Sequence, residues 1–313
     1  MANNTKQSLN REKTEIIKTI LYFDVFKYPL TRIELFENAA ITISFNQFVL
    51  ELEELIEKRL LKEEEGFVSS LERTSSDIIK RLKGNEGASK ILPIALKYSR
   101  RIASFPFVES ISLSGSISKN YFDEKSDIDY FVITKPNRLW LCRTFLILYY
   151  KLQPRSKKKF LCTNYFISSN NLNIPDINTF TGTELAFLIP TVNYNLYKQL
   201  IEKNNWYNGR YPNKKAAPSL YCIETPNPIL KKLIEFLMRG KIGNWFDNQL
   251  LEITLKRWRR KYPLMNEADF DLQFRSRKDV CKRHSHGFQN KIIALWDTNL
   301  ESFENKFQYS LKS

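Results

Sequence analysis

The stretch LSGSISKNYFDEKSDIDYFVI, residues 113–133, places two aspartates two positions apart at the start of a β-prone run. Side chains alternate between the two faces of a strand, so Asp127 and Asp129 are predicted to point to the same face. Two neighbouring carboxylates repel each other unless a cation lies between them. Hard divalent ions such as Mg²⁺ take oxygen ligands and bridge to phosphates. The pattern predicts a metal site, with ordinary solvated charge as the alternative.

A Gly-Ser pair lies about ten residues before the aspartates, at the end of a predicted strand, VESISLSG. A turn at Gly115 and Ser116 that leads into a short helix presents backbone N–H groups, which is a typical anion site. Lys119 follows one helical turn later and is predicted to reach a phosphate. We therefore expect a phosphate cradle that faces the two carboxylates across one pocket.

These residues resemble the DNA polymerase β-like nucleotidyltransferase superfamily, whose core pattern is Gly-Ser followed by Asp-x-Asp. More loosely, TELAFLIP, NNWYNGRYPN and the basic C-terminal segment are similar to a group of bacterial predicted nucleotidyltransferases with an N-terminal winged helix. The resemblance implies that an acceptor hydroxyl of RNA, protein or a small molecule attacks a nucleoside triphosphate (NTP). It also implies that Asp127 and Asp129 hold Mg²⁺ or Mn²⁺ and that Ser116 and adjacent amides hold the β- and γ-phosphates.

The sequence departs from the superfamily at the third carboxylate, which a later strand usually carries. The expected strand, FLCTNYFIS, contains no acid, and Asn164 is its nearest polar residue. An amide oxygen binds metal but is not a general base at neutral pH. Three interpretations stay open: two carboxylates suffice, a residue elsewhere substitutes, or the chain is a nucleotide-sensing regulator or binding module without turnover. No catalytic role is expected for Glu184.

The basic charge is unevenly distributed. The net charge is +15, yet residues 1–90 hold 14 Lys and Arg against 15 Asp and Glu, so the excess lies in the larger C-terminal part. Such an excess attracts polyanions, and a solvated helix face is the alternative. The candidates for contact with a triphosphate or a nucleic-acid backbone are Arg275, Arg277, Lys278 and Lys282. The two histidines, His284 and His286, are either a substrate contact or a loop pair.

The periodicity predicts an α+β fold with a mixed-sheet nucleotidyltransferase core. We expect a winged-helix-like domain at 1–70, a helical connector at 71–104 that contains a turn, the core at 105–178, and an α-helical domain at 179–313. Thr31, with Glu34 three residues later, and Ser44 are predicted helix N-caps. The third helix, from residue 45, carries many glutamates, which favours packing or protein contact over DNA reading.

The composition excludes several other classes. Glycine is scarce, with 9 residues, and no P-loop or dinucleotide motif is present. No stretch approaches the roughly 20 apolar residues that span a bilayer, and the polar N-terminus lacks a signal peptide, so we expect a cytoplasmic protein without a membrane partner. The four cysteines are far apart and form no CxxC pair. The oligomeric state stays open.

Overall fold

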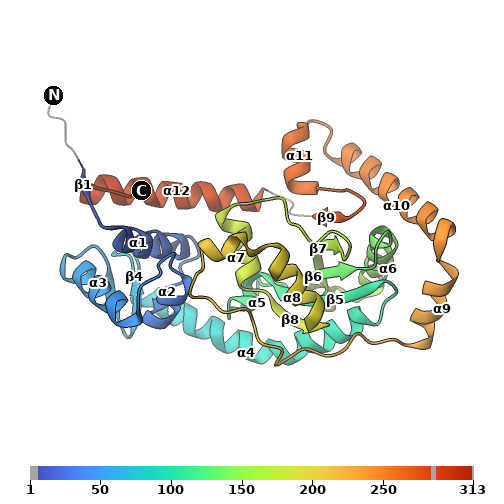
Figure 1. The fold of residues 1–313 in the computed structure, drawn as a ribbon, viewed down its shortest axis with the longest axis horizontal. Coiled ribbons are helices and arrows are strands. Elements are labelled where there is room, and N and C mark those ends of the chain that lie inside the picture. The colour runs from blue at the N-terminus through green and yellow to red at the C-terminus, as the bar shows by residue number, and fades with distance from the viewer. Residues whose placement is uncertain (1–5, 283–286, 312–313) are drawn as a thin grey trace.

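The computed structural model describes residues 6–282 and 287–311 (Figure 1). The fold is α+β, with a mixed sheet near the middle of an elongated molecule. Helices of the N-terminal part lie at one end, and helices α9 and α10 lie at the other (Figure 1). Within the described residues, no helix is long and apolar enough to cross a membrane.

The N-terminal part contains three helices and a small antiparallel sheet of order β2-β4-β3. Its elements are α1 (Arg11–Asp24), β2 (Leu30–Thr31), α2 (Arg32–Asn38), α3 (Phe45–Glu57), β3 (Lys62–Glu64) and β4 (Phe67–Ser69). The predicted caps are confirmed. The Thr31 hydroxyl accepts from the Glu34 amide at 3.2 Å, the Glu34 carboxylate accepts from the Thr31 amide at 2.8 Å, and the Ser44 hydroxyl accepts from the Gln47 amide.

Helix α4 (Ser75–Ala103) runs for 29 residues, so the turn expected in the connector is wrong. The two glycines within this helix serve close packing. Gly84 lies against the ring of Tyr121, and Gly87 lies against the backbone of Phe122. A side chain at either position would push the 121–122 segment away from the helix. The glycines therefore allow a tertiary contact and do not form a local turn.

The central sheet has the order β8-β5-β6-β7-β9, in which only β6 and β7 are parallel to each other. Its strands are β5 (Val108–Ser114), β6 (Asp129–Thr134), β7 (Cys162–Ser168), β8 (Ile189–Val192) and β9 (Val280–Lys282). Two of them, β8 and β9, come from the range 179–313 that was expected to be helical. The sheet therefore extends beyond the predicted core at 105–178, because both of its edges are supplied by distant segments.

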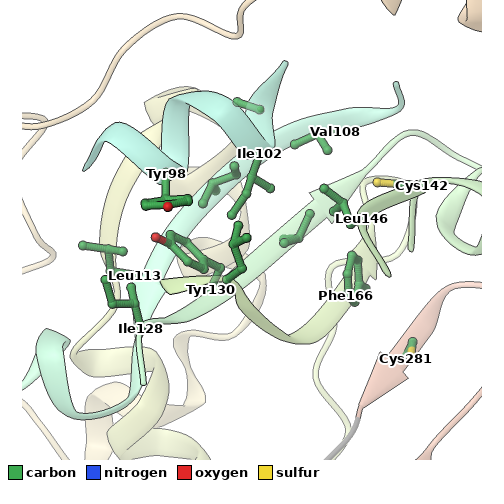
Figure 2. Close-up of a cluster of buried hydrophobic side chains, with 14 of the residues drawn as sticks. Tyr98, Ile102, Val108, Leu113, Ile128, Tyr130, Cys142, Leu146, Phe166 and Cys281 are labelled. Carbon is green, nitrogen blue, oxygen red and sulfur yellow. The ribbon is translucent and has the colours of Figure 1, made fainter. Parts of the chain in front are cut away.

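Alternation along the strands gives the sheet two apolar faces. Tyr130 and Val132 point to the face covered by α4 and α6 (Leu139–Leu152), where Tyr98 packs and the Tyr130 hydroxyl donates to the Ala95 carbonyl (Figure 2). Phe131 and Ile133 point to the opposite face, which α7 (Thr179–Ala186) and α8 (Tyr194–Lys203) cover. Asp129 precedes Phe131 by two residues, so its side chain belongs to the α7 face.

The remaining elements are short segments around the sheet and the helices of the C-terminal part. They are β1 (Gln7–Ser8), α5 (Gly115–Ser118), η1 (Arg155–Phe160), η2 (Asn205–Gly209), α9 (Ile229–Leu237), α10 (Gly240–Lys261), α11 (Glu267–Phe274), α12 (Phe288–Phe307) and β10 (Tyr309–Ser310). Helix α12 returns to the N-terminal part, where Trp296 Nε1 donates to the Lys18 carbonyl and β10 pairs with β1. The two ends of the described chain therefore pack together.

Candidate active site

Gly115 and Asp129 meet because β5 and β6 pair in register, with Ser114 opposite Asp129. Gly115 has a φ of +67°, a backbone conformation that side chains rarely adopt. A β-carbon at this position would collide with the Asp129 carboxylate. Glycine is thus required twice, by the turn and by the close approach of the acid.

Asp127 and Asp129 both line one cavity of about 490 Å³. Asp127 is exposed, whereas Asp129 is half-buried. Burial raises the pKa of Asp129 to about 7, and the negative charges of Glu184 and Asp127 act in the same direction. Burial also raises the pKa of Asp127. A cation in this cavity would relieve the cost of ionising both groups.

Asn164 lies beside Asp129, as expected from the strand order. Its amide Nδ2 donates to Asp129 Oδ1 at 2.8 Å, and its Oδ1 accepts from the Cys162 thiol at 3.3 Å. Burial, followed by the charge of Asp129, raises the pKa of the Cys162 thiol to about 12. Asn164 therefore orients the Asp129 carboxylate, while burial disfavours ionisation of the Cys162 thiol.

Glu184 lines the same cavity, although the sequence interpretation assigned it no role. It comes from α7, which crosses the site face of the sheet. Its Oε2 accepts from the Gly115 amide at 3.4 Å, and its Oε1 accepts from Lys119 Nζ at 2.7 Å. A third carboxylate is therefore present, supplied by a helix rather than by β7. The only local signal was an acid in an otherwise apolar stretch, TELAF.

Only one of the three residues of the predicted phosphate cradle lines the cavity. Gly115 lines the cavity, whereas Ser116 and Lys119 do not. Lys119 is held by Glu184 and by the Gly115 carbonyl at 3.1 Å. Helix α5 is a single turn of four residues. The amide of its first residue, Gly115, donates to Glu184.

Of the four basic C-terminal candidates, only Lys282 lines the cavity. It is buried and donates to Asp176 at 3.0 Å and to Gln289 at 2.7 Å. Arg275 is buried behind it and pairs with Asp176 and Asp271. Arg277 and Lys278 are exposed and lie outside the cavity lining. Arg275 and Lys282 share a distant acid, Asp176, whereas Arg277 pairs with the nearby Asp271. Three of the four candidates therefore lie outside the cavity lining.

Arg143 is a basic residue that the sequence interpretation missed. It lies on α6, lines the cavity and is 7% exposed. Its guanidinium carbon lies 5.4 Å from the ring centre of Trp140 and 5.1 Å from that of Trp258. Within residues 6–282 and 287–311, no carboxylate forms an ion pair with it. The two rings hold a positive charge at the cavity wall that is not neutralised by an acid.

The structure thus brings together Asp127, Asp129, Asn164, Gly115 and Lys282, and adds Glu184 and Arg143. Across the part of the chain described, no group of three or more His, Cys, Asp or Glu side chains is arranged to hold a metal ion. His284 and His286 lie outside the described residues. Comparisons with protein-family models, with curated proteins and with solved structures found no match to this chain.

Proposed function

We propose that this chain is a metal-dependent nucleotidyltransferase that moves a nucleoside monophosphate from an NTP to an acceptor hydroxyl. The observation that carries the proposal is the fit of Gly115 against the Asp129 carboxylate at the edge of a cavity that Asp127 also lines. A glycine turn facing Asp-x-Asp across two paired strands is the pattern on which the superfamily resemblance rests. The mixed sheet around it is consistent with the nucleotidyltransferase core expected from the sequence.

The donor set fits a magnesium ion. Mg²⁺ is usually bound by one or two carboxylates, with waters and substrate phosphates completing its coordination. Asp127 and Asp129 supply two carboxylates. Desolvation raises the pKa of the half-buried Asp129, which indicates that its charge lacks a sufficient counterion. When bound, the metal would neutralise phosphate charge and activate the attacking oxygen.

The remaining residues have roles that follow from their contacts. Asn164 fixes the orientation of Asp129 through its amide. Arg143 offers a guanidinium to the triphosphate from the cavity wall. Glu184 provides the carboxylate that β7 lacks and would accept the proton of the acceptor hydroxyl, with Lys119 holding its side chain in place.

The N-terminal part supports a winged-helix interpretation, since three helices are followed by a hairpin. Three of the four glutamates of α3 form ion pairs within this part, which are Glu51 with Lys13, Glu53 with Arg32, and Glu54 with Lys58. An acidic helix of this kind would be repelled by DNA phosphates. We therefore assign the N-terminal part to protein contact rather than DNA reading.

The testing experiment is incubation with each of the four labelled NTPs, Mg²⁺, and RNA, protein or small-molecule acceptors. We expect label transfer and pyrophosphate release by the wild type, and at least about a hundredfold loss in Asp127→Asn and Asp129→Asn. Glu124→Gln is the matched control, because this exposed acid lies in the same loop and outside the cavity lining. No transfer by the wild type under all of these conditions contradicts the enzyme proposal.

The second candidate is a nucleotide-sensing regulator or binding module that binds NTP without turnover. The replacement of the β7 carboxylate by Asn164, whose amide donates to Asp129, favours it. The two candidates differ in one result. NTP binding measured by calorimetry, without pyrophosphate release for any acceptor, supports the sensor and contradicts the transferase.

A further inference from the structure

The inner face of helix α9 combines two polar anchors with an apolar contact, since Ile234 packs against the main core. Lys231 is 3% exposed and donates to the carbonyls of Ala103 and Val108 at 2.9 and 2.8 Å. One turn later, Glu235 accepts from the Phe107 amide at 2.7 Å and from Lys135 at 2.6 Å. Polar side chains therefore anchor the inner face of α9 to the rest of the molecule.

The outer face of α9 is apolar and uncovered. Leu233 is 52% exposed and Phe236 is 59% exposed. The members of this face, here called the α9 ridge, are Ile229, Leu230, Leu233, Phe236 and Leu237. Their spacing is that of one helical face. At the start of α10, Ile242 and Trp245 are also more than half exposed. Large contiguous apolar surfaces of this kind mark interaction sites.

Hydrogen bonds to buried backbone groups fix the rotation of α9. Lys231 donates to two carbonyls, and Glu235 accepts from the Phe107 amide. Rotating α9 to bury the ridge would break these bonds and leave the backbone groups unpaired. Helix α9 also lies at the extremity of the molecule opposite α2 and α3 (Figure 1). The ridge is thus held where a large flat partner can reach it.

The charges beside the ridge are of one sign. Exposed cations are Lys232, Arg239 and Lys241, and the guanidinium of Arg239 lies 4.0 Å from the ring centre of Phe236. Among the described residues, none of the three forms an ion pair. The only acid in the range 226–246 is Glu235, which faces inward. An anionic partner therefore complements the ridge.

A second copy of the chain does not fit this charge pattern. In a two-fold interface the same patch faces itself, so Lys232, Arg239 and Lys241 would oppose the same three cations. An anionic lipid surface complements both the apolar ridge and the cations beside it. Helices with Leu, Ile, Phe and Trp on one side and Lys or Arg beside them bind in the interfacial plane of such membranes.

From this combination we infer that the α9 ridge docks the protein on an anionic lipid surface. The ridge lies on the membrane rather than across it. This inference departs from the sequence-based expectation of no membrane partner, which rested on the lack of a spanning segment and did not consider surface contact by a helix such as α9. This inference is independent of the proposed transferase activity.

The test is co-sedimentation of the full chain with vesicles. We expect binding to phosphatidylcholine vesicles that contain about one-third phosphatidylglycerol, and little binding to phosphatidylcholine alone. Raising the salt from about 0.1 M to about 1 M should weaken the binding, since screening reduces the contribution of the cations. Leu233→Asp and Phe236→Asp should each lower vesicle affinity about tenfold or more. The double variant Lys232→Glu/Lys241→Glu should do the same.

The matched control is Ile33→Asp, which changes a residue that is 62% exposed on α2, away from the ridge. It should bind vesicles as the wild type does. Thermal unfolding of every variant separates lost docking from lost folding, and the lysine double variant tests the inference if an aspartate variant unfolds. The inference is overturned if the wild type does not sediment with any vesicles or if every variant binds equally. It is also overturned if light scattering shows a dimer that the ridge variants dissociate and that does not bind vesicles.

Discussion

The α-carbon of Gly115 lies so close to the carboxylate of Asp129 that no side chain fits between them. We expect Gly115→Ala to destabilise the fold by about 2 kcal/mol, because it combines backbone strain with displacement of Asp129. Nucleotidyl transfer should fall by at least about a hundredfold. Unfolding in urea and the transfer assay measure the two effects. Gly66→Ala is the control, since Gly66 also has a positive φ but has open space around it. Equal activity in both variants contradicts the role of the close approach.

Mg²⁺ is expected to stabilise the folded chain through Asp127 and Asp129. At a free concentration of about ten times Kd, binding to the native state alone adds about 1.4 kcal/mol, which raises Tm. The increase should be absent in Asp127→Asn and in Asp129→Asn and should persist in Glu124→Gln. Differential scanning fluorimetry with and without Mg²⁺ measures it. A similar increase in both aspartate variants would place the ion elsewhere.

Glu184 and Lys119 are expected to differ in their effects on turnover, although they form one ion pair. Glu184→Gln removes the proposed proton acceptor and should lower kcat about a hundredfold. Lys119→Met removes only its positioning partner, so a loss within about tenfold is expected. Steady-state kinetics at saturating NTP distinguish them. Wild-type kcat in Glu184→Gln would show that the proton acceptor is another group.

Features of this site were predictable where the interacting residues are close in sequence and were missed where they are far apart. The cap at Thr31 follows from neighbours within a few residues and was predicted. Asp127 and Asp129 line one cavity, although Asp127 lies before β6 rather than on the strand. Glu184 reaches Gly115 from 69 positions away, and periodicity gives no information on such contacts. For the same reason the sequence did not indicate that Arg275 pairs with Asp176, which lies in a loop about a hundred residues earlier.

Arg143 is expected to contribute to NTP affinity through its planar guanidinium. Arg143→Lys keeps the charge but loses the paired donors and much of the stacking between Trp140 and Trp258. We expect KM for NTP to rise about tenfold, with a smaller change in kcat. Arg277→Lys is the control, since Arg277 is exposed outside the cavity lining. An unchanged KM in Arg143→Lys contradicts the assignment.

Asp24 should make stability depend on pH independently of the active site. This carboxyl is 8% exposed, and burial raises its pKa to about 6, although the charge of Arg73 acts in the opposite direction. The folded state therefore binds the proton more tightly than the unfolded state does. Stability is lost as the pH rises from about 4 to about 6, by about 3 kcal/mol at most.

Asp24→Asn mimics the protonated form and should be more stable than the wild type at about pH 8, by about 2 kcal/mol. The advantage should shrink toward zero as the pH is lowered to about 4, because the wild-type carboxyl is then neutral as well. Urea unfolding across this range measures the difference. Asp297→Asn, an exposed site on α12, controls for general loss of negative charge. A variant less stable than the wild type at about pH 8 would mean that the ion pair with Arg73 outweighs the cost of burying the charge of Asp24.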